Sequence, residues 1–266
     1  MKLPSLLLSA LFAFGSMAAA EPLKIGVVPG AYGDAVEVAA AEAKAQGFDV
    51  EPIEFSDWTT PNVALASGDI DLNFFQHVPF MTNAEKQGGY DLHAVAPGIL
   101  ANLGLYSLKH KSFDEIPDGG SVAIANDPVN QGRGLLLLQK AGLITLKDGV
   151  GFLGTVDDIT ANPRHLKFTE VEGPQLVRIT GDVDLAQGYP HFIVAAGTFD
   201  PTSALLYSGI EDRQFAVNFV SREDNKDDPR IARFIALFQQ SPAVKAQIHK
   251  SFASSDKLYI LAWGAK

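Results

Sequence analysis

The sequence predicts an α/β fold with two lobes, each built on a mostly parallel β-sheet flanked by helices. Strand-like and helix-like segments alternate along the whole chain, which is typical of parallel sheets with helices on both faces. The chain of 266 residues is longer than a single doubly wound domain usually is, since domains most often contain about 100–150 residues. With 47% hydrophobic residues and no cysteine, the chain can form such cores without disulfides.

The first twenty residues have the pattern of a secretory signal peptide. Lys2 gives the positive start, residues 3–14 are apolar, and small residues end at Ala20, so we expect cleavage between Ala20 and Glu21. The apolar run is shorter than the ~20 residues that span a bilayer. The chain also lacks the cysteine that lipoproteins acylate. The sequence therefore predicts a freely diffusing periplasmic protein without a membrane anchor.

Composition and motifs argue against several classes of protein. The 21 basic and 31 acidic residues give a net charge of −10, and such a field repels nucleic acid, so no nucleic-acid partner is expected. The chain contains no G-x-S-x-G, Walker A or H-E-x-x-H motif, and its histidines show no metal-ligand spacing. A calcium loop at residues 69–73 is disfavoured because Phe74 occupies the position that needs glycine. We expect no enzymatic activity, no cofactor and no metal.

The first half of the mature chain reads as three strand–helix pairs. We expect strands at residues 23–28, 50–55 and 70–74. The first helix should follow at residues 34–46 with Asp34 as its N-cap. Thr60 and Pro61 should open the second helix, and a third should follow Pro79.

The second half continues this alternation. Strands are expected at residues 121–125, 166–171 and 215–221. Helices are expected at residues 129–141, 229–239 and 242–252, the first of them ending at Gly142. We assign residues 1–20 to the signal peptide, 21–105 and 220–266 to lobe I, and 106–219 to lobe II.

Ligands of such sheets lie beyond the carboxyl ends of the strands, near helix N-termini. The stretch "GDIDLNFFQHVPFM" places Phe75, Gln76 and His77 at such an end, where they could form the wall of a small-molecule pocket. The alternative is that Phe75 and Phe80 are core residues and His77 only caps the next helix. The turn "GVVPGAYGDA" does not have dinucleotide-binding spacing, and we expect it to touch ligand or the other lobe.

A second junction, "IANDPVNQGRGLLLLQ", has the chemistry of a carboxylate site. Asn130 and Arg133 are three residues apart and share one helix face near the helix N-terminus, where an anion is favoured. Arg133 adds a planar fork that suits a carboxylate. Gly132 and Gly134 leave the backbone open to close approach. The alternative is a surface arginine paired with a nearby acid. A carboxylate site facing an aromatic wall indicates an amino acid or short peptide as ligand.

The chain resembles the NlpA/MetQ family, the methionine-binding lipoproteins that feed an ABC importer. The resemblance covers nearly the whole mature chain and rests on "FSDW--PN-AL--GDID-N-FQH-PF", "NDP-N-GR-LLLLQKAGLI-LKDGVG", "NP--LKF-E-E-PQL-R" and "REDNKDDP". It implies the two-lobed periplasmic-binding-protein fold. It also implies that "FFQHVPF" is the side-chain wall of the ligand cleft.

By position, the resemblance assigns two groups of ligand contacts. Around the ligand side chain it places Trp58, Phe75, His77 and Phe80. For the carboxylate it assigns Asn130 and Arg133 from the second lobe. Trp58 and Phe80 stand where the family more often has tyrosine.

Two further positions depart from the methionine binders. Tyr189 replaces one ligand asparagine, and the place of the second falls on Val217, with Asn218 one residue off. A shift of one residue turns a strand side chain to the opposite face, so Asn218 reaches the cleft only if a bulge corrects the register. We include Tyr189 and Asn218 among the expected ligand contacts.

The sequence thus predicts a periplasmic solute-binding protein that holds an amino acid or related small carboxylate between two lobes. Its expected partners are an inner-membrane ABC permease and its ATPase, and we expect a monomer. The alternative is a surface or sensor protein that has kept the fold and lost import. A periplasmic enzyme on the same scaffold is a third hypothesis, for which no nucleophile or metal constellation was found.

Overall fold

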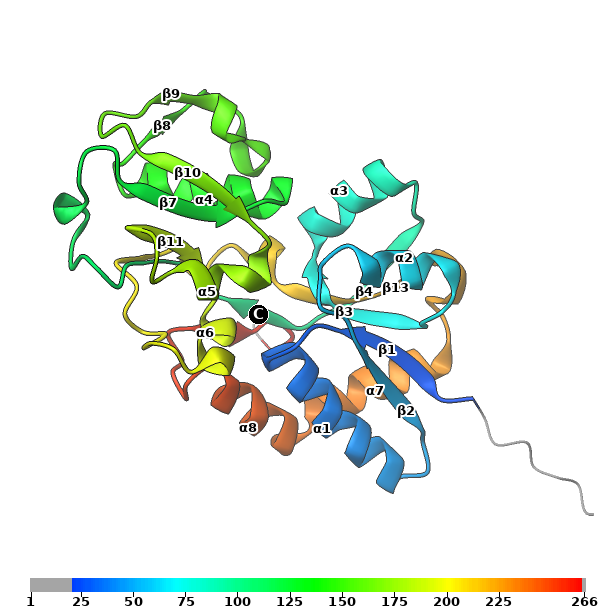
Figure 1. Cartoon of the computed structure of the whole chain (residues 1–266). Coiled ribbons are helices and arrows are strands. Elements are labelled where there is room, and N and C mark those ends of the chain that lie inside the picture. Colours follow the sequence, from blue (N-terminus) through cyan, green and yellow to red (C-terminus); the bar gives the residue numbers. More distant parts are fainter. Residues whose placement is uncertain (1–20, 265–266) are drawn as a thin grey trace, which may run out of the picture.

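Two five-stranded β-sheets organise the chain in the computed structural model, which describes residues 21–264 (Figure 1). The first sheet has the strand order β2 (Val50–Glu54), β1 (Leu23–Val27), β3 (Leu72–His77), β13 (Val217–Arg222) and β4 (Leu92–Pro97). The second has the order β10 (Lys167–Val171), β7 (Ser121–Ala125), β11 (Leu185–Gly188), β6 (Gly104–Tyr106) and β12 (Leu206–Tyr207). The predicted signal peptide lies outside the described residues.

In each large sheet, half of the strand pairs are parallel and half are antiparallel. In the first sheet β1 is parallel to β2 and β3, whereas β13 is antiparallel to both of its neighbours. In the second sheet β10, β7 and β11 are parallel, and β6 is antiparallel to β11 and β12. Two small ribbons pair β5 (Ile99–Ala101) with β14 (Tyr259–Leu261) and β8 (Thr145–Leu146) with β9 (Ile159–Ala161). The predicted α/β class is confirmed.

Helices cover the sheets, and several of them start where sequence rules place them. The longer ones are α1 (Ala31–Ala45), α3 (Val78–Gly88), α4 (Pro128–Lys140), α7 (Pro229–Gln240) and α8 (Pro242–Ser251). The shorter ones are α2 (Thr60–Ser67), α5 (Leu176–Ile179) and α6 (Pro190–Ala196). Side chains of Asp127, Asp228 and Ser241 cap α4, α7 and α8, each followed by proline at the first helical position.

One expected cap is wrong. Helix α1 begins at Ala31 behind Gly30, whose positive φ of 94° allows the sharp turn. Asp34 therefore falls inside the first turn, and its carboxylate accepts a hydrogen bond from Ser251 of α8 instead. Helix α2 begins at Thr60 with Pro61 in its first turn, as expected, but its cap does not come from the flanking threonine. Asp57 supplies it, because its carboxylate accepts hydrogen bonds from the backbone N–H groups of Thr59 and Thr60.

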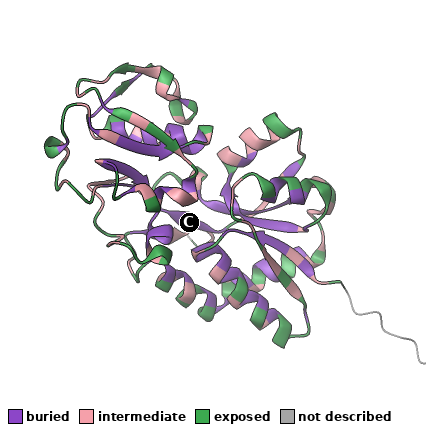
Figure 2. Cartoon of the chain, viewed as in Figure 1, coloured by how far each residue is buried: buried purple, intermediate pink, exposed green. Residues whose placement is uncertain are grey.

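Each large sheet has its own apolar core, and the inner strands are buried on both faces, whereas the edge strands β2 and β10 are partly exposed (Figure 2). Helices α1, α7 and α8 pack together against the first sheet (Figure 1). Helix α4 packs against β7 in the second sheet. Helix α6, which follows β11 of the second sheet, contacts α1 and α8. The segment around α6 thus brings the second sheet against the helices of the first.

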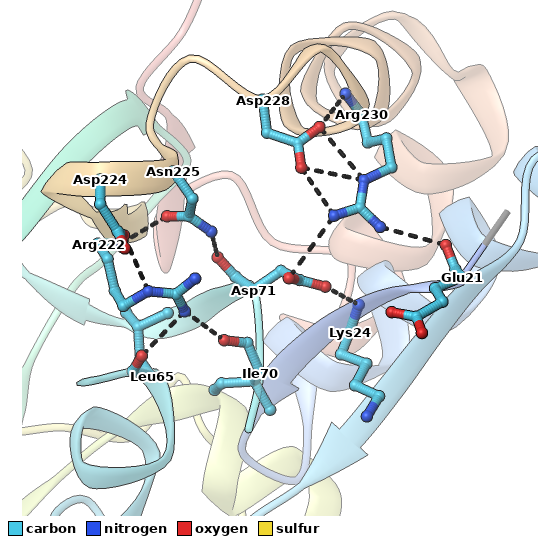
Figure 3. A network of polar contacts seen from close by, with 10 residues as sticks. All are labelled: Glu21, Lys24, Leu65, Ile70, Asp71, Arg222, Asp224, Asn225, Asp228 and Arg230. Carbon is cyan, nitrogen blue, oxygen red and sulfur yellow. Dashed lines mark hydrogen bonds and ion pairs between the residues drawn. The ribbon is translucent and has the colours of Figure 1, made fainter. Parts of the chain in front are cut away.

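A polar network fixes β3 beside β13 and explains the motifs "GDID" and "REDN" (Figure 3). Arg222, at the end of β13, donates hydrogen bonds to the carbonyl oxygens of Leu65 and Ile70. Asn225 donates to the carbonyl oxygen of Asp71. The carboxylate of Asp71 accepts from the backbone N–H of Lys24 and pairs with Arg230 at 3.7 Å. These residues position the strands of the first sheet and lie away from the inter-sheet cavity described below.

The expected lobe boundaries cut through two strands. Residues 104–106 form β6 and pair in the second sheet, whereas all of β13 at residues 217–222 pairs in the first. Sheet pairing therefore places the two points where the chain passes from one lobe to the other just before residue 104 and in the segment between β12 and β13. We propose these as the lobe boundaries. The third expected strand is also shifted: it runs from Leu72 to His77 rather than over 70–74.

Candidate functional site

A cavity lies between the two sheets, at the carboxyl ends of β3, β7 and β11. It is lined by Tyr32, Trp58, Phe75, Gln76, His77, Phe80, Ala101, Asn130, Arg133, Tyr189, His191, Phe192, Phe215 and Val217. The cavity has a volume of about 40 Å³. All predicted site residues except Asn218 line this cavity. The two junctions chosen from sequence thus meet in space, as the rule for carboxyl ends of strands requires.

A bulge in β3 explains how consecutive residues reach the cavity. Side chains of a regular strand alternate between faces, yet Phe75, Gln76 and His77 all line the cavity. In the pairing of β3 with β13, Asn218 lies opposite Gln76 and Phe219 opposite Phe74, so Phe75 is the extra residue. Such a bulge re-aims side chains next to functional sites. Here the amide of Gln76 is hydrogen-bonded to Asn62 and Asn73, and Phe75 and His77 on either side of it line the cavity.

Aromatic side chains form one wall of the cavity and join its two halves. Trp58 packs against the cores of both sheets. Its ring lies edge-on to Phe80 at 6.4 Å and to Tyr189 at 5.6 Å between centroids. Phe75 is 7% exposed and belongs to the first core, so it is both a core residue and part of the lining.

His77 both caps helix α3 and bridges the two halves of the cavity. Its Nδ1 accepts a hydrogen bond from the backbone N–H of Phe80, which places the ring proton on Nε2. Nε2 lies 3.2 Å from Oδ1 of Asn130 on α4 and donates to it. Burial, together with the charge of Arg133, lowers the pKa of His77 to about 3. The ring is therefore neutral at physiological pH.

Asn130 is held by hydrogen bonds on both ends of its amide. Its Oδ1 accepts from Nη1 of Arg133 at 3.0 Å as well as from His77. Its Nδ2 donates to both carboxylate oxygens of Asp127, the residue that caps α4. The arrangement orients Arg133 and fixes which way the amide points.

Among the described residues, Arg133 is the only permanently cationic side chain that lines the cavity. Its guanidinium lies 4.2 Å above the ring of Phe215 and donates to Asn130. Within residues 21–264, no carboxylate forms an ion pair with it. Arg133 is therefore not a surface arginine paired with an acid, which was the alternative. Burial lowers the pKa of Arg133, but a guanidinium stays protonated in proteins.

Gln187 of β11 supports this part of the site from behind. Its Nε2 donates to the carbonyl oxygen of Asn130 and to the hydroxyl of Tyr189, and its Oε1 accepts from the backbone N–H of Ala125. A Cβ at position 134 would overlap Gln187. Gly134 thus allows the side chain of Gln187, rather than a ligand, to approach the backbone of α4.

Val217, and not Asn218, faces the cavity. The side chain of Asn218 is turned away and donates to the carbonyl oxygen of Ala216 at 2.7 Å. The expectation that Asn218 lines the site is therefore wrong. Bulges do occur here, but they insert Phe75 into β3 and Val95 into β4. Because β13 itself has no extra residue, its register still points Val217 at the cavity.

Comparison with known proteins agrees with this architecture. Residues 23–260 match the family model described as NlpA lipoprotein. The chain belongs to the NlpA lipoprotein family. It is 42% identical over 226 residues to the D-methionine-binding lipoprotein MetQ of Escherichia coli (strain K12), covering 84% of this chain and 83% of that protein.

Two solved structures of similar proteins extend the NlpA-family comparison. A nutrient-binding protein from Burkholderia cenocepacia bound to methionine has a TM-score of 0.83 and 36% identity, over 90% of this chain and 99% of that one. A periplasmic substrate-binding protein of an ABC transporter from Coxiella burnetii has a TM-score of 0.80 and 36% identity, again over 90% and 99%. These values confirm the predicted two-lobed fold and the NlpA/MetQ resemblance.

The NlpA family corrects the expectation about membrane attachment. The family and the relatives at 41–42% identity are named as lipoproteins. The inference of a freely diffusing, unanchored protein, drawn from the missing cysteine, is contradicted by these names and is withdrawn. Within residues 21–264, no helix is long and apolar enough to cross a membrane.

Several lining residues of this NlpA-family site were not predicted as ligand contacts. The turn "GVVPGAYGDA" was expected to touch ligand or the other lobe, and Tyr32 within this stretch lines the cavity. His191 and Phe192 follow Tyr189 and Pro190 at the end of β11, a signal that sequence reasoning could have used. Phe215 precedes β13 and carried no local signal, because only the fold brings it over Arg133.

Proposed function

We propose that this chain is the periplasmic solute-binding protein of an ABC importer and that it holds a small carboxylate between its lobes. Similarity to a D-methionine-binding lipoprotein and to an ABC transporter substrate-binding protein supports this. Its partners are the permease and ATPase of that importer, and it binds its ligand as a monomer without converting it. Closure of the lobes around ligand presents the form that the permease recognises.

One observation carries the choice of a carboxylate. Arg133 places a permanent positive charge in an aromatic cavity, and no acidic side chain lines that cavity within the described residues. The guanidinium is half-buried, and a charge withdrawn from water is costly unless it is paired. A ligand carboxylate would pair with the planar guanidinium and complete the site.

The same lining disfavours a free α-ammonium group on the ligand. Oδ1 of Asn130 already accepts two hydrogen bonds, and Val217 offers no polar group. Tyr189 contributes a hydroxyl, which is a weaker replacement for an amide that both donates and accepts. We therefore propose that the preferred ligand resembles methionine but has its amine absent, blocked or displaced.

Calorimetric titration of protein stripped of bound ligand tests the role of Arg133. Arg133→Ala should weaken binding of the preferred carboxylate by about 2–5 kcal/mol, because a charge in the closed cavity is left unpaired. Arg178→Ala is the matched control, since Arg178 is an exposed arginine on α5 of the same lobe. Equal affinity of the Arg133→Ala variant and the wild type would contradict the proposal.

The amine is tested with a matched pair of ligands, L-methionine and α-hydroxy-γ-methylthiobutyrate. We expect the hydroxy acid to bind more tightly by about tenfold, which corresponds to one lost hydrogen bond of about 1.4 kcal/mol. Val217→Asn should raise the affinity for L-methionine, because it restores an amide to the cavity. Nanomolar binding of L-methionine by the wild type would contradict the proposal, because it would show that the amine is accommodated without an amide at position 217.

A further inference from the structure

His191 lies on α6 and is enclosed by aromatic side chains from both lobes. It is 3% exposed. Its ring centroid lies 4.8 Å from that of Tyr32 on α1 and 5.7 Å from that of Phe252 on α8. On its own helix, Phe192 lies 4.3 Å away. His191, Tyr32 and Phe192 all line the inter-sheet cavity, so His191 borders the space that a ligand would occupy.

Both ring nitrogens of His191 are buried and have no hydrogen-bond partner. Within residues 21–264 they are the only buried side-chain nitrogen or oxygen atoms in this condition. Such groups are rare in folded proteins because leaving them unpaired costs stability. His77, the other histidine in the lining, has both nitrogens engaged by protein groups. The contrast indicates that the missing partner of His191 is a group the chain itself does not supply.

We propose that His191 is a ligand-binding residue that determines specificity: its imidazole exchanges hydrogen bonds with a second polar group of the bound carboxylate. The proposal rests on the proposed function, because it presupposes that Arg133 holds the carboxylate in this cavity. A neutral imidazole has one N–H donor and one acceptor nitrogen. A hydroxyl or an amide on the ligand can form a hydrogen bond with the N–H donor, with the acceptor nitrogen, or with both.

The second polar group is uncharged. Burial lowers the pKa of His191 to about 3, so the ring carries no charge at physiological pH. No Asp, Glu or Lys side chain is found in the cavity lining of the described residues. A second charge on the ligand would therefore be buried without a counter-ion, which is costly. The ligand class is a small monocarboxylate with a neutral polar substituent, such as an α-hydroxy acid or an N-acyl amino acid.

Titrations with three probes test this role. The probes are γ-methylthiobutyrate, which lacks a second polar group, α-hydroxy-γ-methylthiobutyrate and N-acetyl-L-methionine. The wild type should bind at least one polar probe about tenfold more tightly than γ-methylthiobutyrate, which equals about 1.4 kcal/mol. His191→Phe keeps an aromatic ring without nitrogens and should reduce that preference to about twofold or less. Its affinity for γ-methylthiobutyrate should stay the same.

Controls separate recognition from packing. His191→Gln keeps a donor and an acceptor and should retain part of the preference. The melting temperature of ligand-free His191→Phe should equal or exceed that of the wild type, because two unpaired buried nitrogens are removed. Equal weakening of all three probes, or no change in preference, would overturn the role of His191. If the wild type binds none of them and Arg133→Ala is equally inert, the proposed function fails and the inference with it.

Discussion

Two neutral histidines, His77 and His191, share the cavity, and burial sets the charge state of both. Each has a pKa lowered from 6.5 to about 3. His77 has protein partners for both nitrogens and therefore contributes to closure. His191 has none, which makes it available to ligand. Two residues with the same chemistry thus have different roles because their surroundings differ.

The lowered pKa values predict an acid-sensitive stability. Between pH 6.5 and about 3, the unfolded chain binds protons at these histidines whereas the folded protein does not. Stability is therefore fully present above pH 6.5 and falls on acidification, by up to about 1.4 kcal/mol per pH unit for each histidine. Chemical denaturation of ligand-free protein at a series of pH values measures this. His191→Phe should reduce the slope, and an unchanged slope would show that His191 is charged or solvated when folded.

At the scale of elements, a strand bulge and a close helix contact shape the site. The bulge at Phe75 lets one strand contribute three neighbouring lining residues. Helix α4 lies so close to the turn at residues 151–153 that a Cβ at Gly132 would overlap the carbonyl group of Phe152. This contact fixes the position of α4, and hence of Arg133, relative to the cavity.

Gly132→Ala should destabilise the protein by about 1–3 kcal/mol, because backbone must move to admit the methyl group. Gly181→Ala is the control, since a Cβ there would meet only Leu108 at 3.9 Å and the position has no positive φ. Urea unfolding of both variants gives the comparison. A Gly132→Ala variant as stable as Gly181→Ala would mean that α4 is not held tightly by this turn.

For the whole molecule, closure depends on contacts that cross between the lobes. His77 donates to Asn130 across the cavity, and Trp58 packs against both cores. Ligand binding to both lobes would add to these contacts and shift the population toward the closed form. Trp58 is therefore a natural reporter of closure, since the chain has only 2 tryptophans.

Trp263→Phe leaves Trp58 as the single fluorescent tryptophan. Adding ligand should shift its emission to shorter wavelength, as expected for an indole that becomes more buried. His77→Ala in the same background should raise the ligand Kd by about three- to tenfold, the value of one hydrogen bond. Gln87→Ala serves as the control: Gln87 is an exposed residue on the same helix, α3, and does not line the inter-sheet cavity. An emission spectrum that does not respond to bound ligand would contradict closure at Trp58.

The sequence by itself determined the α/β class, the two junctions and the place of Arg133, the proposed cationic anchor, at one of them. These follow from local rules: hydrophobic alternation, proline and acid at helix starts, and the position of strand ends in parallel sheets. Arg133 could be named because its residue type and its place near a helix N-terminus already indicate an anion site. The cap of α1 was misplaced because a glycine with positive φ can start a helix without a capping side chain.

Only the tertiary structure decided what surrounds that anchor. Whether Val217 or Asn218 faces the cavity depends on which strand carries the bulge, and pairing with β3 and β4 settles it. Gln187, Phe215 and His191 lie far from Arg133 along the chain and meet it or its cavity only through sheet order and helix packing. Whether a buried histidine has a partner depends on every element packed around it. For that physical reason, the unpaired nitrogens of His191 are visible only in the folded protein.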